Sequence, residues 1–432
     1  MNNVRDFGAV GDGKTSDTLA IQRAIDAGGE VYFPAGIYKT GTIYLKSNGG
    51  LCFERGAVLQ SGGNEETWNA PDFCPANRTS VYEKNNGRHL ICAYKCENIS
   101  IRGGKIDGNC FEWYNELSKE HPYFELKEHN GQMIFLCECE NVRIQDCELT
   151  NSPYWHCFLH GCNHVFISGI YVHSNPMVHC NDGIDLDCCT NVVVSNCIIE
   201  TGDDAITLRG NSAVFGNDER FCENITVTNC VLEAERADGI RIGVGNGAVR
   251  NCSFSDIIIK NSNIGIELAA SFTKDTGADM ENMEFSNIRM NNTYRPFQII
   301  IGPIKSYEEF FTSEAVASPA YIRNITFNNI RGEFQASSRI RGSAAKNAID
   351  NIEFNNVKLD FYGKGNAPYF GNDGRWDKGS YDCAYRIKET GRISFKDCAV
   401  KWCANEDLWK SEIEADDAEI IIENCVFPKD SK

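Results

Sequence analysis

The sequence predicts an all-β fold, a right-handed parallel β-helix with a short N-terminal capping helix, formed as a single domain over residues 1–432. Two observations carry this prediction. A seven-residue strand motif recurs along the chain, and no segment between its copies has a long amphipathic helical period. A repeat fold can use a long chain as one unit, because each repeat packs mainly on its neighbours.

The motif reads Asn, apolar, any, apolar, any, Asn/Asp/Gly, apolar. Good copies begin at Asn141, Asn191, Asn224, Asn251, Asn282, Asn324 and Asn351, and weaker copies at Asn98, His164, Arg392 and Glu419. Alternating apolar residues indicate a strand, and a turn residue then leads into a second short strand. The copies start 23 to 43 residues apart. Like residues are therefore expected to stack from coil to coil at about 4.8 Å, with the extra residues forming loops.

The N-terminal segment differs from the repeats. Residues 17–26 (DTLAIQRAID) have apolar residues at helical spacing, which predicts a short helix with Asp17 as its cap. Such a helix would cover the open end of the first coil.

The composition limits the kinds of partner that the chain is expected to bind. The formal net charge is −18 and no cluster of Lys and Arg is present, so we expect no nucleic-acid partner. No run of 18 apolar residues predicts a membrane span. The 21 cysteines lack zinc-site spacing, and we expect them to be reduced and buried, with no metal or other cofactor. Because the first residues also lack an apolar signal region, we expect a cytoplasmic protein.

The second strands of successive coils align in one frame, with segments 156–160, 182–186, 204–208, 238–242 and 264–268 matched to one another. The third and fifth positions are mostly apolar and are expected to face the core, which leaves the first and fourth on the outer surface. The first position reads His156, Asp182, Asp204, Asp238 and Ile264. The fourth position reads Leu159, Asp185, Thr207, Arg241 and Glu267.

This frame predicts three stacked aspartates, with Asp203 beside them. Exposed like charges at this spacing cost roughly a few tenths to 1 kcal/mol per pair, so the fold does not need them. One carboxyl in such a group commonly keeps its proton. A protonated acid with one or two carboxylates that activate water is the equipment for glycoside hydrolysis. Two alternatives remain open, turn chemistry at Asp-Gly corners and a calcium site.

Two further side chains are candidates for substrate contact. His156 falls in the aspartate column, and Trp155 next to it is a candidate aromatic platform for a sugar ring. The alternative for Trp155 is core packing, and His160, at the apolar fifth position, is expected to be a core histidine.

These residues resemble glycoside hydrolase family 28, the polygalacturonases and rhamnogalacturonan hydrolases. The resemblance lies in residues 4–13, 15–18, 28–37, 151–155, 181–185 and 201–206. It implies a pectin-lyase-like solenoid and an inverting hydrolase acting on a carbohydrate. Asp203 would then be the general acid, while Asp182 and Asp204 would hold and deprotonate the water.

The chain also departs from that family pattern. Asp238 stands where the family has its active-site histidine, and Gly265-Ile266-Glu267 stands where the family has Arg-Ile-Lys. Two cations are lost and two acids gained, which disfavours a galacturonate next to the cut. We expect a neutral sugar or another linkage there, contacted by Asp238, Glu267, Arg241 and Asp185. The alternatives are a polysaccharide lyase with Arg241 as its basic residue, and a non-catalytic carbohydrate-binding solenoid.

Overall fold

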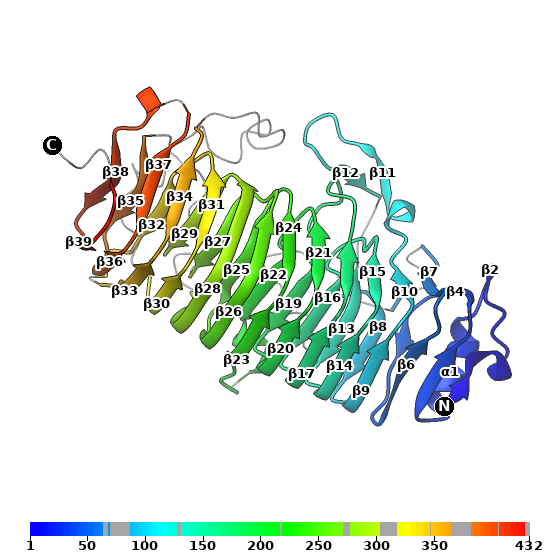
Figure 1. The fold of residues 1–432 in the computed structure, drawn as a ribbon. Coiled ribbons are helices and arrows are strands. Elements are labelled where there is room, and N and C mark those ends of the chain that lie inside the picture. Colours follow the sequence, from blue (N-terminus) through cyan, green and yellow to red (C-terminus); the bar gives the residue numbers. More distant parts are fainter. Residues whose placement is uncertain are drawn as a thin grey trace. The chain divides into compact units, whose positions relative to one another are not determined.

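The computed structural model describes residues 1–63, 68–69, 87–127, 131–216, 218–270, 277–302, 318–345, 347–363, 382–404 and 406–427. The chain forms two compact units, one of Met1–Asp203 with Val214–Asp218 and one of Asp204–Ala213 with Glu219–Lys432. Each unit is described by itself below, with the elements labelled in Figure 1.

The first unit consists of three rows of parallel strands. The first row contains β1 (Asn2–Asn3), β3 (Glu30–Phe33), β6 (Gly49–Phe53), β9 (Glu97–Arg102), β14 (Glu140–Gln145), β17 (Asn163–Ser168) and β20 (Thr190–Ser195). The second contains β2 (Asp12–Ser16), β4 (Gly36–Thr40), β7 (Ala57–Ser61), β10 (Lys105–Asp107), β15 (Glu148–Thr150), β18 (Tyr171–His173) and β21 (Ile198–Thr201). The third contains β5 (Ile43–Tyr44), β8 (His89–Tyr94), β13 (Gln132–Cys137), β16 (Cys157–His160) and β19 (Ile184–Asp187). A hairpin of β11 (Tyr114–Leu117) and β12 (Phe124–Leu126) stands apart from these rows.

The second unit repeats the same three rows. Its first row contains β23 (Phe221–Thr228), β26 (Ala248–Lys260), β28 (Asp279–Thr293), β30 (Ile322–Asn328), β33 (Ile349–Asn355), β36 (Arg392–Lys396) and β39 (Glu419–Glu423). The long strands β26 and β28 also join the second row, with β24 (Val231–Ala234), β31 (Arg331–Phe334), β34 (Lys358–Phe361) and β37 (Ala399–Trp402). The third row contains β22 (Ile206–Gly210), β25 (Asp238–Gly245), β27 (Ile264–Ala269), β29 (Arg295–Ile300), β32 (Ser338–Arg341), β35 (Cys383–Lys388) and β38 (Ser411–Asp416). Stacked parallel strands in both units confirm the predicted mostly-β solenoid.

The repeated asparagines have a structural cause. Those that open the motif adopt left-handed backbone, for example Asn141 at a φ of 55° and Asn324 at 57°, a conformation that asparagine tolerates well. Their side chains also bond from coil to coil. Asn141 donates to Asn98 at 2.7 Å in the first unit, and Asn324 donates to Asn282 at 3.1 Å in the second. The motif therefore marks corners of the coils where amide ladders form.

Stacked side chains fill the interior in the same way. In the second unit, phenylalanine rings from successive coils lie 4.8–5.0 Å apart and within 14° of parallel. These rings belong to Phe254, Phe285, Phe327, Phe354 and Phe395. Such stacks bury apolar area in a regular column, which favours one register over its neighbours.

The predicted N-terminal helix is present as α1 (Thr18–Asp26), and it buries Ala20, Ile21, Ala24 and Ile25. Its cap differs from the prediction. Asp17 precedes the helix, but its carboxylate accepts hydrogen bonds from the backbone N–H groups of Val10 at 2.7 Å and Gly11 at 3.0 Å. Asp17 therefore fixes the preceding loop rather than capping the first turn.

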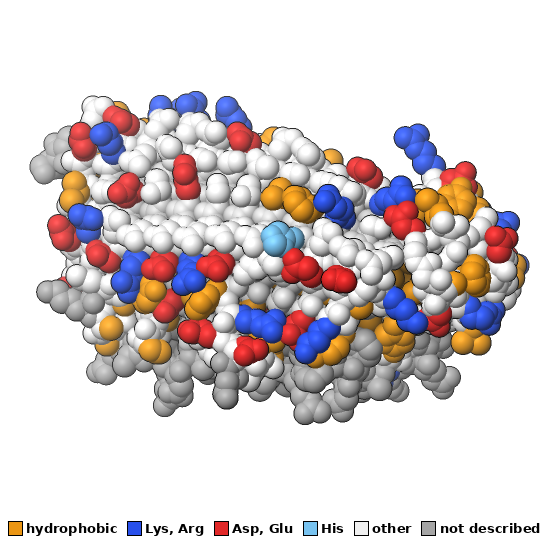
Figure 2. All heavy atoms as spheres, turned by 90° about the horizontal axis from the view of Figure 1, so that it is seen from below, with side chains coloured by type: hydrophobic (Ala, Val, Ile, Leu, Met, Phe, Trp, Pro, Cys, Tyr) orange, Lys and Arg blue, Asp and Glu red, His pale blue; other side chains and the backbone are white. Residues whose placement is uncertain are grey.

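The cysteines are mostly buried, as expected. None of the 20 cysteines in the described ranges forms a disulfide, and 16 of them are buried. No helix among the described residues is long and apolar enough to cross a membrane. On the face shown in Figure 2, acidic and basic side chains are interspersed among uncharged surface, without a continuous basic stripe.

Candidate active site

The register of the third row tests the predicted frame within each unit. In the second unit, Ile206 pairs with Ile240, Asp238 with Ile264, and Arg241 with Glu267, as the frame predicts. In the first unit the frame is wrong by one residue. Phe158 pairs with Asp185, and His160 with Asp187, so Leu159 faces the core instead of the surface. The frame failed because the sequence of β16, CFLH, has no polar–apolar alternation to read.

Asp182 and Asp203 both belong to the first unit, and Asn181 connects the segments that carry them. The Asn181 Oδ1 atom accepts hydrogen bonds from the backbone N–H groups of Gly202 at 3.0 Å and Asp203 at 2.9 Å. Its Nδ2 atom donates to the Asn175 carbonyl at 2.8 Å, and the whole side chain is buried. Asn181 therefore holds the backbone of Asp203 beside the coil that contains Asp182.

The two carboxylates are close but differently exposed. An oxygen of Asp182 and an oxygen of Asp203 lie within 4.8 Å of each other. Asp182 is 3% exposed, whereas Asp203 is half-buried and so is open to a ligand. Gly202 permits this approach, because an added Cβ would lie 2.6 Å from the Pro176 Cα and 2.9 Å from the Asn181 Oδ1.

His156 does not lie in the aspartate column. The register of β16 against β19 shifts His156 by one residue from the position that the frame predicted, and its ring is fully buried. Its Nδ1 lies 2.8 Å from the Asp182 carbonyl oxygen, which can only accept, so Nδ1 carries the hydrogen. Its Nε2 accepts from the Ser152 N–H at 3.4 Å. Burial lowers the pKa of His156 to about 4, so the ring is neutral and supports the Asp182 backbone instead of contacting substrate.

Trp155 is not an exposed platform. It is 2% exposed in an aromatic cluster, where its ring stacks on Tyr154 at 5.1 Å and meets Phe158 edge-on at 5.0 Å. Core packing, the alternative stated above, describes its role. Asp185 is likewise fully buried, beside Phe158 on β19.

In the second unit, the acids are arranged around a cation. The Arg241 guanidinium lies 2.6 Å from Glu267, 3.5 Å from Asp238 and 3.7 Å from Asp204. The Asp238 N–H donates to Asp204 at 3.0 Å, and Gln298 donates to Glu267 at 2.5 Å. All three acids are at most 5% exposed, so this cluster is a largely buried ion network.

The surroundings shift the pKa values of Asp238 and Glu267 in opposite directions. Burial raises the pKa of Asp238 well above its usual range, and the neighbouring Glu267 and Asp204 charges raise it further. Burial alone would also raise the pKa of Glu267. However, Arg241 and hydrogen bonds from Asp238 and Gln298 outweigh burial and hold the Glu267 pKa below its usual range. Asp238 is therefore the protonated partner, and Glu267 the carboxylate that accepts its hydrogen bond.

Three residues of these arrangements escaped the sequence reasoning. Asn181 lies in a motif that drew attention only to its neighbouring aspartates. Arg295 and Gln298 lie on β29, one coil beyond the segments that the predicted frame matches. Extending the frame by one coil would have found them, since β29 pairs with β27 and brings Gln298 next to Glu267. Arg295 is buried as well, and its guanidinium donates to the Ser337 carbonyl.

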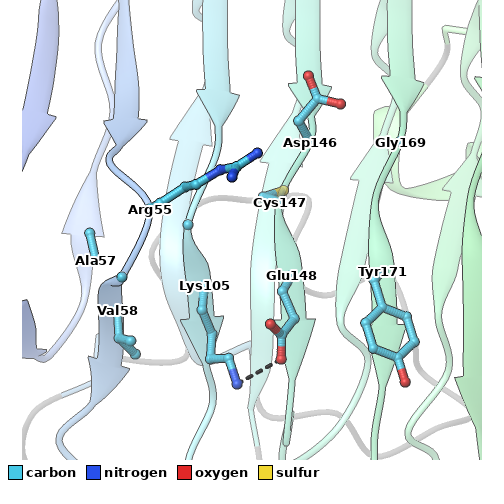
Figure 3. A pocket seen from close by; sticks show the side chains of 11 residues that line it. Arg55, Ala57, Val58, Lys105, Asp146, Cys147, Glu148, Gly169 and Tyr171 are labelled. Carbon is cyan, nitrogen blue, oxygen red and sulfur yellow. Dashed lines mark ion pairs between the residues drawn. The ribbon is translucent and has the colours of Figure 1, made fainter. Parts of the chain in front are cut away.

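A pocket of the first unit is lined by other residues. It has a volume of about 450 Å³, and Figure 3 shows Arg55, Lys105, Asp146, Glu148 and Tyr171 around it. Lys105 and Glu148 form an ion pair at 2.6 Å, drawn as a dashed line. None of the predicted site residues lines this pocket.

The protein-family comparison assigns residues 71–369 to the family described as glycosyl hydrolases family 28. That match covers more than two thirds of the sequence. The chain belongs to glycosyl hydrolases family 28. It is thus an O-glycosyl hydrolase of a polygalacturonase-like family, as the sequence motifs suggested. Residues 1–51 also match a family described as rhamnogalacturonase A/epimerase, pectate lyase-like.

Individual relatives of this family 28 chain are distant. It is 26% identical to polygalacturonase QRT2 of Arabidopsis thaliana, over 83% of this chain and 77% of that protein. It is 25% identical to an endo-polygalacturonase of Pectobacterium carotovorum, over 79% and 84%. A probable polygalacturonase of Vitis vinifera is 29% identical, but that alignment spans only 49% of this chain and 44% of the relative.

Solved structures confirm the fold of this family 28 hydrolase. A family 28 exopolygalacturonase from Yersinia enterocolitica superposes with a TM-score of 0.75 at 19% identity, over 97% of this chain and 77% of that one. A surface adhesin of Streptococcus pneumoniae superposes with a TM-score of 0.51 at 15% identity, over 98% of this chain and 97% of that one. The same fold therefore hosts different functions, and the specificity of this hydrolase has to be argued from its own residues.

Proposed function

We propose that this family 28 hydrolase cleaves a glycosidic bond next to a neutral sugar, and that ordinary polygalacturonate is a poor substrate. The observation that carries the proposal is the buried ion network of Arg241, Asp238 and Glu267 in the second unit. In the family pattern a histidine and cations stand at these positions, whereas here Asp238 and Glu267 stand there and the neighbouring Arg241 already contacts both.

The charges explain the preference. A galacturonate needs a cation with free hydrogen-bonding capacity to balance its carboxylate. Arg241 contacts three acids within 3.7 Å, so its hydrogen-bonding capacity is already used, and a further carboxylate beside it would also face the Glu267 carboxylate. The hydroxyl groups of a neutral sugar can instead donate to the Glu267 carboxylate, which suits an acceptor-only group.

We propose that Asp203 is the general acid and that Asp182 and Asp204 bind and activate the water, as the family resemblance implies. Asp203 is the more exposed of the two acids in the first unit, which suits proton delivery to a leaving oxygen. The stereochemical outcome is drawn from the resemblance, which implies inversion. Carboxyl groups about 6.5–9.5 Å apart are typical of inverting enzymes and about 5–5.5 Å of retaining ones, so NMR analysis of the anomeric configuration of the first products tests this outcome.

A lyase mechanism is disfavoured by the state of Arg241. Burial lowers the pKa of this guanidinium, but the charges of Glu267, Asp204 and Asp238 outweigh burial and raise the pKa above its usual value. A guanidinium held in this way stays protonated and is a poor base.

We also propose a cytoplasmic location and action on short imported oligosaccharides, supported by the 20 free cysteines of the described ranges. Cell fractionation tests the location. Thiol titration of the denatured protein without reductant should find 21 thiols, the number of cysteines in the sequence.

The experiment that tests the proposed function is a substrate screen. Reducing-end release is measured on polygalacturonate and on pectic and hemicellulosic oligosaccharides that contain neutral sugars, with an Asp203→Asn variant as the blank. We expect release from a neutral-sugar substrate and little from polygalacturonate. Brisk release of galacturonic acid would contradict the proposal and restore the usual family activity.

A further inference from the structure

The first unit contains a second group of metal-ligating side chains, outside the acids described above. Strands β16 and β19 pair in register, which places His160 beside Asp187 where both strands end. Cys188 follows with a φ of 51°, a left-handed conformation that turns the chain at this point. One donor atom from each of the three residues lies within 4.8 Å of the other two.

We propose that His160, Asp187 and Cys188 form a metal site that binds one Zn²⁺ ion. The site is independent of the proposed hydrolytic function. It replaces two readings of the sequence, that His160 is a core residue and that the chain binds no metal.

The distance between the donor atoms of His160 and Asp187 is close to the distance between two ligands of one zinc ion. The His160 Nε2 and Asp187 Oδ2 atoms are 3.9 Å apart, which is too long for a hydrogen bond. Nitrogen and oxygen ligands at 2.0–2.2 Å from a tetrahedral zinc are about 3.3–3.6 Å from each other. A shift of about half an ångström would therefore bring both atoms into the zinc coordination sphere.

The three side chains of the proposed site are buried together. His160 is fully buried, and Asp187 and Cys188 are each 2% exposed. The Phe215 ring, which belongs to the same unit, lies edge-on against the His160 ring at 4.6 Å and helps to exclude water.

The donor set suits zinc in particular. Imidazole nitrogen, carboxylate oxygen and thiolate sulfur are the three ligand types that Zn²⁺ accepts, and three protein ligands leave a fourth position for water. Calcium and magnesium prefer oxygen ligands alone. Because the thiol must lose its proton to bind, zinc affinity should weaken as the pH falls.

The site would join two adjacent coils. His160 ends one coil's strand, and Asp187 and Cys188 end the next, so one ion would bridge them. We expect the ion to stabilise the first unit and to take no part in bond cleavage.

The test uses the full chain, stripped with a chelator and dialysed against ZnCl₂ or CoCl₂ alone. The wild type should bind one equivalent of zinc, and cobalt should give a thiolate-to-metal charge-transfer absorption. Cys188→Ser should abolish that absorption. His160→Gln should weaken cobalt binding at least about tenfold, since even residues behind the ligands contribute 10–100-fold in metal sites.

Two variants serve as controls. Cys189→Ser removes the next thiol along the chain, which is equally buried and points to the Leu159 carbonyl at 3.3 Å. Cys180→Ser removes a cysteine whose sulfur lies 2.9 Å from the His179 ring. Both should keep one equivalent of metal and the cobalt–thiolate absorption.

Two results would overturn the proposal. One is a wild type that binds less than half an equivalent of zinc or gives no cobalt–thiolate band. The other is a band that survives Cys188→Ser but disappears in Cys189→Ser or Cys180→Ser. Circular dichroism of each variant identifies unfolded protein, and the Asp187→Asn variant gives a second test of the site if Cys188→Ser does not fold.

Discussion

The two units hold their acidic residues by different means. In the first unit, neutral groups position Asp182 and Asp203: the Asn181 amide bonds the backbone of Asp203, and a neutral His156 bonds the backbone of Asp182. In the second unit, a guanidinium and a shared proton hold Asp238 and Glu267. In the first unit these neutral groups hold the backbone of each acid, whereas in the second unit an ion network holds the carboxylates themselves.

This contrast assigns different tasks to the two sets of residues. We infer that Asp182, Asp203 and Asp204 determine how fast a bond is cleaved, and that Arg241, Asp238 and Glu267 determine which sugar is accepted. The predictions below separate these tasks, beginning with the largest expected effect.

Replacing Asp203 by Asn should lower turnover by about 10²–10⁴-fold, because asparagine keeps the volume but cannot protonate the leaving oxygen. The measurement is kcat on a natural glycoside, since an activated aryl glycoside needs less protonation and would hide the loss. Asp256→Asn is a matched control, because it removes the same charge at a ladder position where Asn287 donates to Asp256. Near-normal activity of Asp203→Asn would remove this residue from its role.

Asn181→Ala should lower kcat by roughly 10²-fold, as a displacement of about 1 Å does at reacting groups. The two N–H groups of Gly202 and Asp203 would lose their acceptor. Because Asn181 is proposed to position Asp203 and not to bind sugar, KM should change little. An Asn181→Asp variant keeps the acceptor oxygen and should recover part of the lost rate. A large rise in KM with unchanged kcat would contradict the positioning role.

Asp238→Asn should change the pH dependence of stability. Because the folded pKa of Asp238 is raised, the folded protein keeps a proton that the unfolded chain releases above about pH 4. The contribution of Asp238 to the free energy of unfolding is therefore fully present below its pKa in the unfolded chain. It declines by up to about 1.4 kcal/mol per pH unit as the pH rises toward its pKa in the folded protein.

Asparagine does not titrate and keeps a donor for Glu267. The free energies of unfolding of the wild type and the variant, measured with urea, should therefore differ more at pH 7 than at pH 4. Relative to the wild type, the variant should be more stable at pH 7. Parallel stability curves across this range would show that Asp238 is ionised in the folded protein.

Much of the fold was predictable, because its repeating contacts leave a repeating trace in the sequence. Asparagines such as Asn141 and Asn324 recur since each stands in left-handed backbone and bonds the coil below. The frame of residues 204–268 was also predictable, because polar and apolar residues alternate on β25 and β27.

The wrong predictions concern residues where the sequence has no repeating pattern of polar and apolar residues. The sequence of β16, CFLH, has no polar–apolar alternation, so its register could not be predicted, and the buried His156 and Trp155 were assigned to the surface. The proton shared by Asp238 and Glu267 depends on burial and on Gln298, which no local pattern in the sequence reports. Stacked acids could be inferred, but not which of them stays protonated.

The most direct test of the division of tasks compares Asp203→Asn and Glu267→Gln on one pair of substrates, polygalacturonate and a neutral-sugar oligosaccharide cleaved by the wild type. The quantity measured is kcat/KM on each substrate. We predict that Asp203→Asn lowers both values by a similar factor and leaves their ratio unchanged. Glu267→Gln should shift the ratio toward polygalacturonate by roughly tenfold, the effect of about 1.4 kcal/mol from one removed charge. An unchanged ratio in Glu267→Gln, with a changed ratio in Asp203→Asn, would contradict the account.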